Sequence, residues 1–337
     1  MELNRYSRQA LFPAIQESGQ RRLLESTVLV VGAGALGTVI CNHLVRSGIG
    51  NIRIVDRDYV EMSNLQRQML FDEKDVQDAL PKAIAMKQKL EVINSSINIE
   101  AIVGHVTNEN IHSLVKGVDV VMDGTDNMAT RLLLNDICYK EKIPYTYGGV
   151  VSSRGMSAFF IPDKTPCLRC MTKGNSTNGQ TCDTVGVLSP AVDIVASLEV
   201  IETMKYLTGN DQALRNTLHT VDLWSNKHYD IKLMRTDPDC LTCQQQTYPA
   251  LQKKVTDVET VLCGRDTVQI QQHDQLDLKE WVKKLDPVAT VKETPFLIKA
   301  QISETIQFVL FPDGRILVQG TEDIAKARTW YDRYIGS

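Results

Sequence analysis

The sequence predicts an α/β fold: a mostly parallel sheet with helices on both faces, continued by antiparallel strands and followed by a small α+β domain. Three observations lead to this prediction. Short apolar runs alternate with helical patterns through the first half of the chain. After Pro144, the apolar runs follow one another closely, separated by a turn. At 337 residues, the chain also exceeds what one hydrophobic core usually supports.

The first half of the chain supplies the parallel strands. Residues 27–31 form a continuous β-branched apolar run, which is typical of a strand buried on both faces. A glycine-rich segment leads from this run into a helical pattern that Gly48 ends. We expect further strands at residues 52–56, 99–103 and 118–122, and helices at residues 81–93, between the last two strands, and at 129–140.

The pattern changes after Pro144. We expect strands at residues 145–151 and 156–161 with a turn at 152–155, a long amphipathic helix at about 191–207, and closing strands at 221–224 and 229–234. The two faces of the long helix are marked by Val192, Val195, Leu198, Glu199 and Glu202. This succession of strands extends the predicted sheet beyond its parallel part.

A polar stretch at residues 244–254 predicts the domain boundary, so that the domains span residues 1–247 and 255–337. In the second domain we expect a helix at 278–285, a hairpin of 308–311 and 315–318 turned by Pro312-Asp313-Gly314, and a final helix at 323–334. The sequence does not indicate what this domain does.

The composition excludes several classes of protein. Apolar residues make up 43% and charged residues 23% of the chain, which argues against disorder and low-complexity architectures. The formal charge of −4 lacks the basic excess expected of a surface that binds nucleic acid or an anionic membrane. No apolar run reaches the roughly 18–20 residues that span a bilayer. The polar N-terminus does not resemble a signal peptide. We expect a soluble, cytoplasmic protein.

A glycine motif predicts nucleotide binding. Gly32-x-Gly34-x-x-Gly37 follows a predicted strand and opens a helix, where glycines let backbone N–H groups approach a polyphosphate. Asp56 comes 19 residues after Gly37, at the end of the next strand, where a carboxylate can accept a hydrogen bond from a ribose hydroxyl. Together these features favour a Rossmann-like nucleotide site over glycines used only for packing. Alone, the motif is commonest in NAD-dependent oxidoreductases.

Charged residues near this motif favour ATP. Asn64 and Arg67 follow the second strand, and Lys82 begins the next helix. Chemistry at the α-phosphate needs fixed cations and N–H donors to balance the charge that develops. Asp126 follows another strand, at the edge where a carboxylate can hold Mg²⁺. Singly, Arg67 and Lys82 are more typical of solvated surface charges, and Asp126 is as typical of a helix N-cap.

Two Cys-x-x-Cys pairs predict a metal site. Cys167 and Cys170 form one Cys-x-x-Cys pair, and Cys240 and Cys243 form another. Four thiolates in two such turns suit a closed tetrahedral Zn²⁺ site. A redox pair is the alternative, but redox chemistry does not need a second pair.

Three further cysteines are interpreted one by one. Cys41 and Cys138 lie within apolar helical patterns and are expected to be buried small hydrophobes. Cys182 follows the polar segment 173–180, where an exposed thiol could act as a nucleophile or could be idle.

These motifs resemble those of the ThiF/MoeB family, bacterial relatives of the ubiquitin-activating enzymes. The resemblance covers roughly residues 1–244. It is carried by Arg5-Tyr6-Ser7-Arg8-Gln9, Gly32–Gly37, Ser63-Asn64-Leu65-Gln66-Arg67-Gln68, Pro81-Lys82, Thr125-Asp126-Asn127 and the two Cys-x-x-Cys pairs. It implies ATP-dependent adenylation of the C-terminal glycine of a ubiquitin-like sulfur carrier, with release of pyrophosphate. The carrier would be ThiS-like or MoaD-like, in thiamine-thiazole or molybdopterin synthesis.

The resemblance also implies roles for individual residues. Asp56 would hold the ribose, and Asp126 would serve Mg²⁺. Arg8 would reach the ATP of the partner subunit in a homodimer, and the zinc would be structural. The phosphate contacts would include Asn64, Arg67 and Lys82. The rest of the expected nucleotide site consists of Gly32, Gly34, Ala35, Gly37, Ser63, Leu65, Gln66 and Asn127.

Two departures from the family pattern stand out. The glycine loop carries Ala35 where many members have Gly. Lys82 follows Asp78-Ala79-Leu80-Pro81 rather than the more usual Gly-x-Pro, so the local loop is expected to differ.

Several alternatives stay open at this point. In some members of the family the cysteine at the place of Cys182 forms a covalent link to the carrier, and in others it is dispensable. The sulfur could also come from an external persulfide donor. The other functional classes are an NAD-dependent oxidoreductase, on the glycine motif and Asp56, and a non-catalytic module that binds ubiquitin-like proteins.

Overall fold

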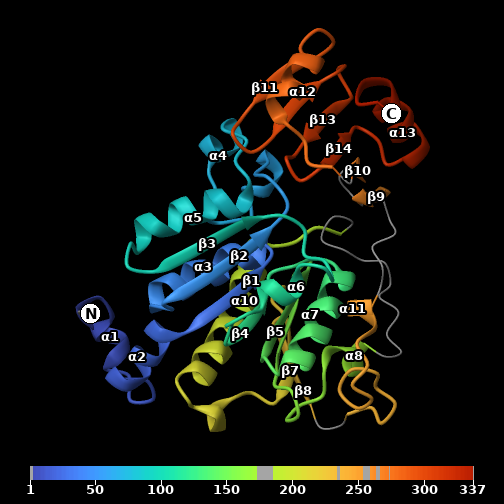
Figure 1. The fold of residues 1–337 in the computed structure, drawn as a ribbon. Coiled ribbons are helices and arrows are strands. Elements are labelled where there is room, and N and C mark those ends of the chain that lie inside the picture. Colours follow the sequence, from blue (N-terminus) through green and yellow to red (C-terminus); the bar gives the residue numbers. More distant parts are fainter. Residues whose placement is uncertain are drawn as a thin grey trace. The chain divides into compact units, whose positions relative to one another are not determined.

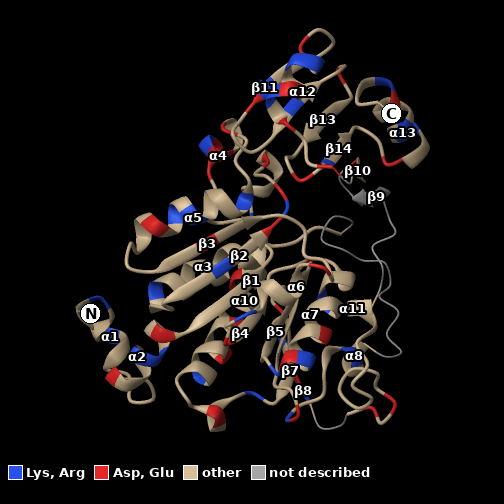
Figure 2. Cartoon of the chain, in the orientation of Figure 1, with Lys and Arg blue, Asp and Glu red and all other residues tan. Residues whose placement is uncertain are grey.

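The structure is a computed structural model that describes residues 3–172, 185–233, 236–252, 259–262, 266–272 and 274–336. It divides into two units, residues 1–254 and 255–337, and each is described by itself. Acidic and basic residues are interspersed along the coloured part of the chain (Figure 2), in keeping with the small net charge of −4. Among the residues described, no helix is both long and apolar enough to cross a bilayer.

The first unit is built on an eight-stranded sheet with the order β3-β2-β1-β4-β5-β6-β7-β8 (Figure 1). The first five strands in this order pair in parallel and the last four in antiparallel fashion, which confirms the predicted fold class. The strands are β1 (Thr27–Val31), β2 (Asn51–Asp56), β3 (Asn98–Val103), β4 (Val120–Asp123), β5 (Tyr145–Val151), β6 (Arg154–Phe160), β7 (Thr217–Asp222) and β8 (Lys227–Lys232).

Helices cover both faces of this sheet. The core on one face is formed with α3, α5 and α10, and the core on the other with α6, α7, α8 and α11 (Figure 1). The α-helices are α1 (Ser7–Ala10), α2 (Gln16–Glu25), α3 (Ala35–Ser47), α4 (Glu73–Gln77), α5 (Lys82–Ile93), α6 (Ile111–Leu114), α7 (Met128–Glu141), α8 (Leu168–Thr172), α10 (Ser189–Leu207) and α11 (Pro249–Gln252). Short 3-10 helices are η1 (Leu3–Tyr6), η2 (Met62–Asn64) and η3 (Asp211–Ala213).

The order of the strands changes direction at β1. From β1 the chain moves to β2 and β3 on one side, and then crosses to β4 on the other. Val31 is in register with Val55 of β2 and with Asp123 of β4, so these three strands end at the same edge. In open α/β sheets, ligands bind outside the carboxyl ends of the strands at such a switch point.

Some predicted boundaries in the antiparallel part are wrong by a few residues. The strand predicted at 221–224 is β7, which ends at Asp222. The Asp222 side chain accepts hydrogen bonds from the backbone N–H groups of Trp224 and Ser225, at 3.2 and 3.4 Å, and so begins a turn there. The turn predicted at 152–155 is shorter, because β6 begins at Arg154.

The amphipathic character predicted for the long helix is also wrong. Glu199 and Glu202 of α10 are buried, with 1% and 2% of their surface exposed. Ile194 and Ile201 are instead 40% and 42% exposed. The polar residues of α10 therefore do not form an exposed face, as they would in an amphipathic helix at the surface.

Both buried glutamates have specific partners. Glu202 accepts a hydrogen bond from Lys205 Nζ at 2.6 Å, and Glu199 Oε2 accepts one from Thr146 Oγ1 at 2.9 Å. Burial raises the pKa of Glu199 well above its ordinary value. A Cβ atom at Gly148 would lie 2.0 Å from Glu199 Oε1, so β5 needs glycine at this position.

The second unit contains a six-stranded sheet with the order β11-β12-β13-β14-β10-β9. Its neighbouring strands all pair antiparallel, and the predicted hairpin is confirmed as β13 and β14, with Gly314 at φ +83° in the turn. The elements are β9 (Glu259–Leu262), β10 (Thr267–Gln271), α12 (Leu278–Leu285), β11 (Thr290–Glu293), β12 (Ile298–Gln301), β13 (Gln307–Leu310), β14 (Arg315–Gln319) and α13 (Ile324–Tyr334).

Candidate nucleotide and metal sites

Two glycines of the motif allow close packing where β1 ends. Gly32 has φ +97°, and a Cβ atom on it would lie 2.6 Å from the carbonyl oxygen of Gly124. A Cβ atom on Gly37 would lie 1.9 Å from the carbonyl oxygen of Gly32. A side chain at Gly32 would therefore push away the loop after β4, and one at Gly37 would push α3 away from the end of β1.

Gly34 is different, because packing does not require it to be glycine. A Cβ atom there would meet only Gly124 O, at an ordinary contact distance of 3.8 Å. Gly34 is the N-cap of α3, where the first backbone N–H groups of the helix have no partners within the helix. A glycine at this place keeps the helix N-terminus open to a ligand, which suits an anion such as a phosphate.

Asp56 lies directly beside the glycine loop. Its carboxylate accepts hydrogen bonds from the backbone N–H of Ala33, at 2.6 Å, and from that of Asp58, at 2.7 Å. Burial raises the pKa of Asp56, and the positive charge of Lys82 opposes that change. The carboxylate is therefore held at the edge where a ribose hydroxyl could donate to it.

Lys82 is brought to the same edge by a turn of the chain. An isolated β-bridge pairs Tyr59 with Pro81, so the segment after β2 runs beside the start of α5. The Lys82 side chain is 3% exposed, and its Nζ lies 3.6 Å from Asp58 Oδ2. The alternative of a solvated surface lysine is therefore wrong, since a cation is seldom buried without a partner or a ligand.

The segment after β2 is organised around a capping box. The backbone N–H of Glu61 donates to Asn64 Oδ1 at 3.2 Å, and Asn64 is 5% exposed. Arg67 is partly exposed, and its Nη1 donates to Ser63 O at 3.0 Å. In this segment the side chains of Ser63 and Gln66 are exposed and that of Leu65 is partly buried.

Asp126 is exposed just past the end of β4. The neighbouring Asn127 is the N-cap of α7, because its Oδ1 accepts a hydrogen bond from Thr130 N at 2.8 Å. The alternative that Asp126 caps this helix is therefore wrong. A carboxylate at this edge could hold Mg²⁺, which takes one or two carboxylates together with phosphate oxygens.

A buried polar network behind this loop was missed by the sequence analysis. Asp123, the last residue of β4, accepts hydrogen bonds from Arg131 Nε at 3.2 Å and from the Tyr145 hydroxyl at 2.8 Å. Arg131 Nη2 donates to the carbonyl oxygens of Thr125 and Gly148, at 2.7 and 2.8 Å. The network fixes the loop between β4 and α7. An acid at a strand end and an arginine in the next helix were the available signal.

Arg8 lies far from the glycine loop of its own chain. Its segment is anchored by Tyr6, whose hydroxyl accepts from Asn94 Nδ2 at 2.8 Å, and by Gln9, whose Nε2 donates to Ser47 O at 2.8 Å. Ser47 ends α3, whereas the glycine loop begins it. A helix of this length spans roughly 20 Å. The segment that carries Arg8 therefore lies at the opposite end of α3 from the glycine loop of its own chain.

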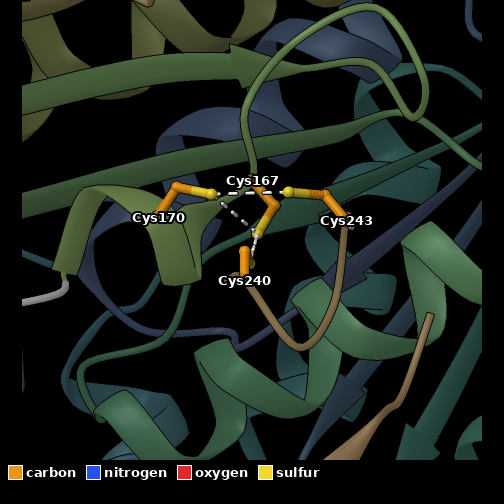
Figure 3. A group of neighbouring side chains, drawn as sticks. All are labelled: Cys167, Cys170, Cys240 and Cys243. Atoms are coloured by element: carbon orange, nitrogen blue, oxygen red, sulfur yellow. Dashed lines mark hydrogen bonds between the residues drawn. The ribbon is translucent and has the colours of Figure 1, made fainter. Parts of the chain in front are cut away.

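The four cysteines predicted to bind metal are brought together. The side chains point toward one another, two from the segment at α8 and two from the loop at residues 240–243 (Figure 3). Their sulfur atoms all lie within 4.8 Å of one another, with Cys167–Cys170 at 3.9 Å, Cys167–Cys240 at 3.5 Å and Cys170–Cys243 at 3.4 Å.

These distances fit a metal ion. Zn–S bonds of about 2.3 Å in a tetrahedron place the sulfur atoms about 3.8 Å apart. The hydrogen bond that Cys167 donates lowers the pKa of Cys170 to about 4, so a thiolate is favoured within the group. The cluster could therefore hold a metal such as zinc.

Two of the three cysteines that were interpreted separately lie in the core. Cys41 and Cys138 are both fully buried, and burial raises the pKa of each thiol, which confirms their interpretation as core residues. The predictions for Cys182 lie outside the described residues.

The chain is similar to a known family and to several known proteins. The model of the ThiF family matches residues 6–242. The chain is 42% identical to the sulfur carrier protein ThiS adenylyltransferase of Bacillus subtilis, over 98% of this chain and 99% of that protein. It is 33% identical to the molybdopterin-synthase adenylyltransferase of Escherichia coli, over 72% of this chain and 97% of that protein. A crystal structure of E. coli MccB with ATP superposes with a TM-score of 0.61 at 25% identity, covering 71% of this chain and 74% of that chain.

Replacing Gly34 by alanine separates ligand binding from packing. Because the new Cβ atom meets no protein atom closer than 3.8 Å, we expect Gly34→Ala to change the free energy of unfolding by no more than about 1 kcal/mol. Binding of ATP, measured by calorimetry, should weaken at least tenfold. Gly32→Ala is the matched control and should lower stability in urea. ATP affinity unchanged by Gly34→Ala would show that no ligand approaches this residue.

Proposed function

The chain belongs to the ThiF family, as its motifs predict, and we propose that it transfers AMP from ATP to the C-terminal carboxylate of a ThiS-like sulfur carrier. The observation that carries the proposal is the identity of 42% with a ThiS adenylyltransferase over nearly the whole of both chains. The open N-terminus of α3 at Gly34, beside Asp56 and Lys82, is the place where the nucleotide would bind.

The proposed reaction needs alignment and charge balance rather than a protein nucleophile. A carboxylate becomes an acylating agent only when one of its oxygens becomes a leaving group, and an acyl-adenylate provides this. The enzyme must hold the carboxylate in line with the α-phosphate and stabilise the departing pyrophosphate. Fixed cations and N–H donors in a partly closed crevice are suited to this task.

Each charged residue at the crevice has a proposed role. The Asp56 carboxylate accepts a hydrogen bond from the ribose. Asn64, Arg67 and Lys82 contact the phosphates. The Lys82 side chain is buried at this edge, with its Nζ 3.6 Å from Asp58 Oδ2. Asp126, exposed at the carboxyl edge of β4, would hold the Mg²⁺ that accompanies ATP.

Sequence identity favours a thiamine-route carrier over a molybdopterin-route carrier, since it is 42% to the ThiS adenylyltransferase and 33% to the molybdopterin-synthase adenylyltransferase. The match to the ThiS adenylyltransferase spans 98% of this chain and therefore includes most of the second unit. The match to the E. coli molybdopterin-synthase adenylyltransferase spans 72%. Both relatives carry adenylyltransferase names, which gives the NAD-dependent alternative no support.

The four-cysteine group is proposed to hold a structural zinc ion. Four protein thiolates would close the coordination shell, leaving no position for a substrate or a reactive water. The ion would cross-link residues 167–170 to residues 240–243. Paired thiolate knuckles of this kind fit a reducing compartment, so we also place the protein in the cytoplasm.

We propose a homodimer in which Arg8 of each subunit enters the partner's nucleotide site. The length of α3, roughly 20 Å, separates the segment of Arg8 from the glycine loop of its own chain and so favours a role in trans. Leu11 and Phe12, which follow Arg8, are 69% and 57% exposed, as expected of residues that a second copy would cover. Sulfur would then reach the adenylated carrier either through Cys182 or from an external persulfide donor, with release of AMP.

Adenylation can be followed directly by mass spectrometry of the carrier. With ATP and Mg²⁺, the wild-type protein should add the mass of AMP to a purified ThiS-like carrier faster than to a MoaD-like one. Lys82→Ala should slow the reaction about 10²–10³-fold, because a fixed cation at the phosphates is lost. Lys87→Ala, five residues further along α5 and partly exposed, is the matched control and should react normally. Wild-type rates for Lys82→Ala would contradict the assigned site.

Mixing two inactive variants tests the action of Arg8 in trans. Arg8→Ala and Lys82→Ala homodimers should each be nearly inactive. After subunit exchange, a heterodimer carries one intact site, so random mixing should restore roughly a quarter of wild-type carrier adenylation in a two-fold symmetric dimer. Arg21→Ala, an exposed arginine of α2, serves as the control variant for Arg8→Ala. A mixture that stays inactive after demonstrated exchange would exclude action in trans.

A further inference from the structure

One carboxylate binds both cysteine segments, residues 167–170 and residues 240–243, without belonging to the group of four cysteines. Asp136 lies in the third turn of α7 and is fully buried. Residues of this type are almost never buried unless they are paired. Its side-chain partners from other segments are Arg169 and Thr242, one from each cysteine segment, so its burial is associated with the metal site rather than with the nucleotide site.

The first cysteine segment is bound to α7 through the two residues between its cysteines. Arg169 Nη2 donates to both oxygens of Asp136, at 3.0 and 2.8 Å. The backbone N–H of Leu168 donates to Oδ1 of Asn135 at 2.9 Å, and Asn135 Nδ2 donates in turn to Asp136 Oδ1 at 3.1 Å. The position of this segment is therefore set by two adjacent side chains of one helix.

The second cysteine segment is bound to the same carboxylate. The Thr242 hydroxyl, between Cys240 and Cys243, donates to Asp136 Oδ1 at 2.6 Å and accepts from Arg169 Nε at 3.0 Å. Thr242 is 1% exposed. The backbone N–H of Ala250, in α11, donates to Asp136 Oδ2 at 2.9 Å. The two segments, some 70 residues apart in the sequence, therefore both donate hydrogen bonds to the buried carboxylate of Asp136.

We propose that Asp136 is the positioning residue of the metal site, which holds both cysteine pairs at ligand spacing before the metal binds. This inference rests on the proposed zinc site and goes beyond the proposed reaction, because it concerns how the site is assembled and not what the enzyme adenylates. Residues that orient metal ligands from outside the coordination shell typically affect metal affinity 10- to 100-fold when removed. The charge of Asp136 is balanced by Arg169 within a network whose members fix one another's geometry.

The test measures zinc release from the full-length protein. The zinc-loaded protein is mixed with an excess of a chromogenic chelator, and the release rate is recorded. We expect Asp136→Asn, which keeps the size of the side chain and removes its charge, to release zinc about 10- to 100-fold faster than the wild type. Asp163→Asn removes an exposed ion pair with Lys142 and should release zinc at the wild-type rate. A wild-type rate for Asp136→Asn would overturn the proposal.

Two variants of Thr242 test the proposal if Asp136→Asn does not fold. Thr242→Val keeps the volume of the side chain and removes the hydroxyl, whereas Thr242→Ser keeps the hydroxyl. We expect faster release only from Thr242→Val, and equal rates for the two would overturn the proposal. Unfolding in urea with and without zinc separates positioning from general stability. The proposal requires the stabilisation that zinc adds to shrink in Thr242→Val, while a general structural role leaves it unchanged.

Discussion

The proposed nucleotide site depends on the close approach of two backbone segments, at Gly32 after β1 and Gly124 after β4. A Cβ atom on Gly32 would lie 2.6 Å from Gly124 O, and one on Gly124 would lie 2.5 Å from Gly32 O. The strands β2 and β4, which flank β1, end at the same edge of the sheet as β1. The glycine loop, Asp56 and the loop at Asp126 therefore lie together at this edge. Polar residues from separate parts of the sequence can therefore act on one ligand.

The helix α7 connects this crevice to the metal site. At its start, Asn127 caps the helix and Arg131 fixes the loop that carries Asp126. One to two turns further along, Asn135 and Asp136 bind the two cysteine segments. The proposed structural metal would therefore stabilise the same helix whose first turn shapes the proposed nucleotide site, without taking part in the proposed reaction.

The sequence predicted those features whose signal is local. The strand at residues 27–31, the glycine motif and the spacing of the paired cysteines each depend on neighbouring residues. Burial of Glu199 was not predictable, because its partner Thr146 is 53 residues away. The same holds for Arg131, whose contact with Gly148 depends on how β5 pairs with β4. Asp126 and Asn127 are both typical N-cap residues, so only the structure distinguishes the cap from the exposed acid.

The central claim is that the crevice binds ATP, not a nicotinamide dinucleotide. Calorimetric titration of the purified protein with ATP and Mg²⁺, and separately with NAD⁺ and NADH, tests it most directly. The account predicts saturable binding of ATP at one site per chain, and no heat of binding above dilution for either dinucleotide. Tight binding of NAD⁺ or NADH, with none of ATP, would contradict it.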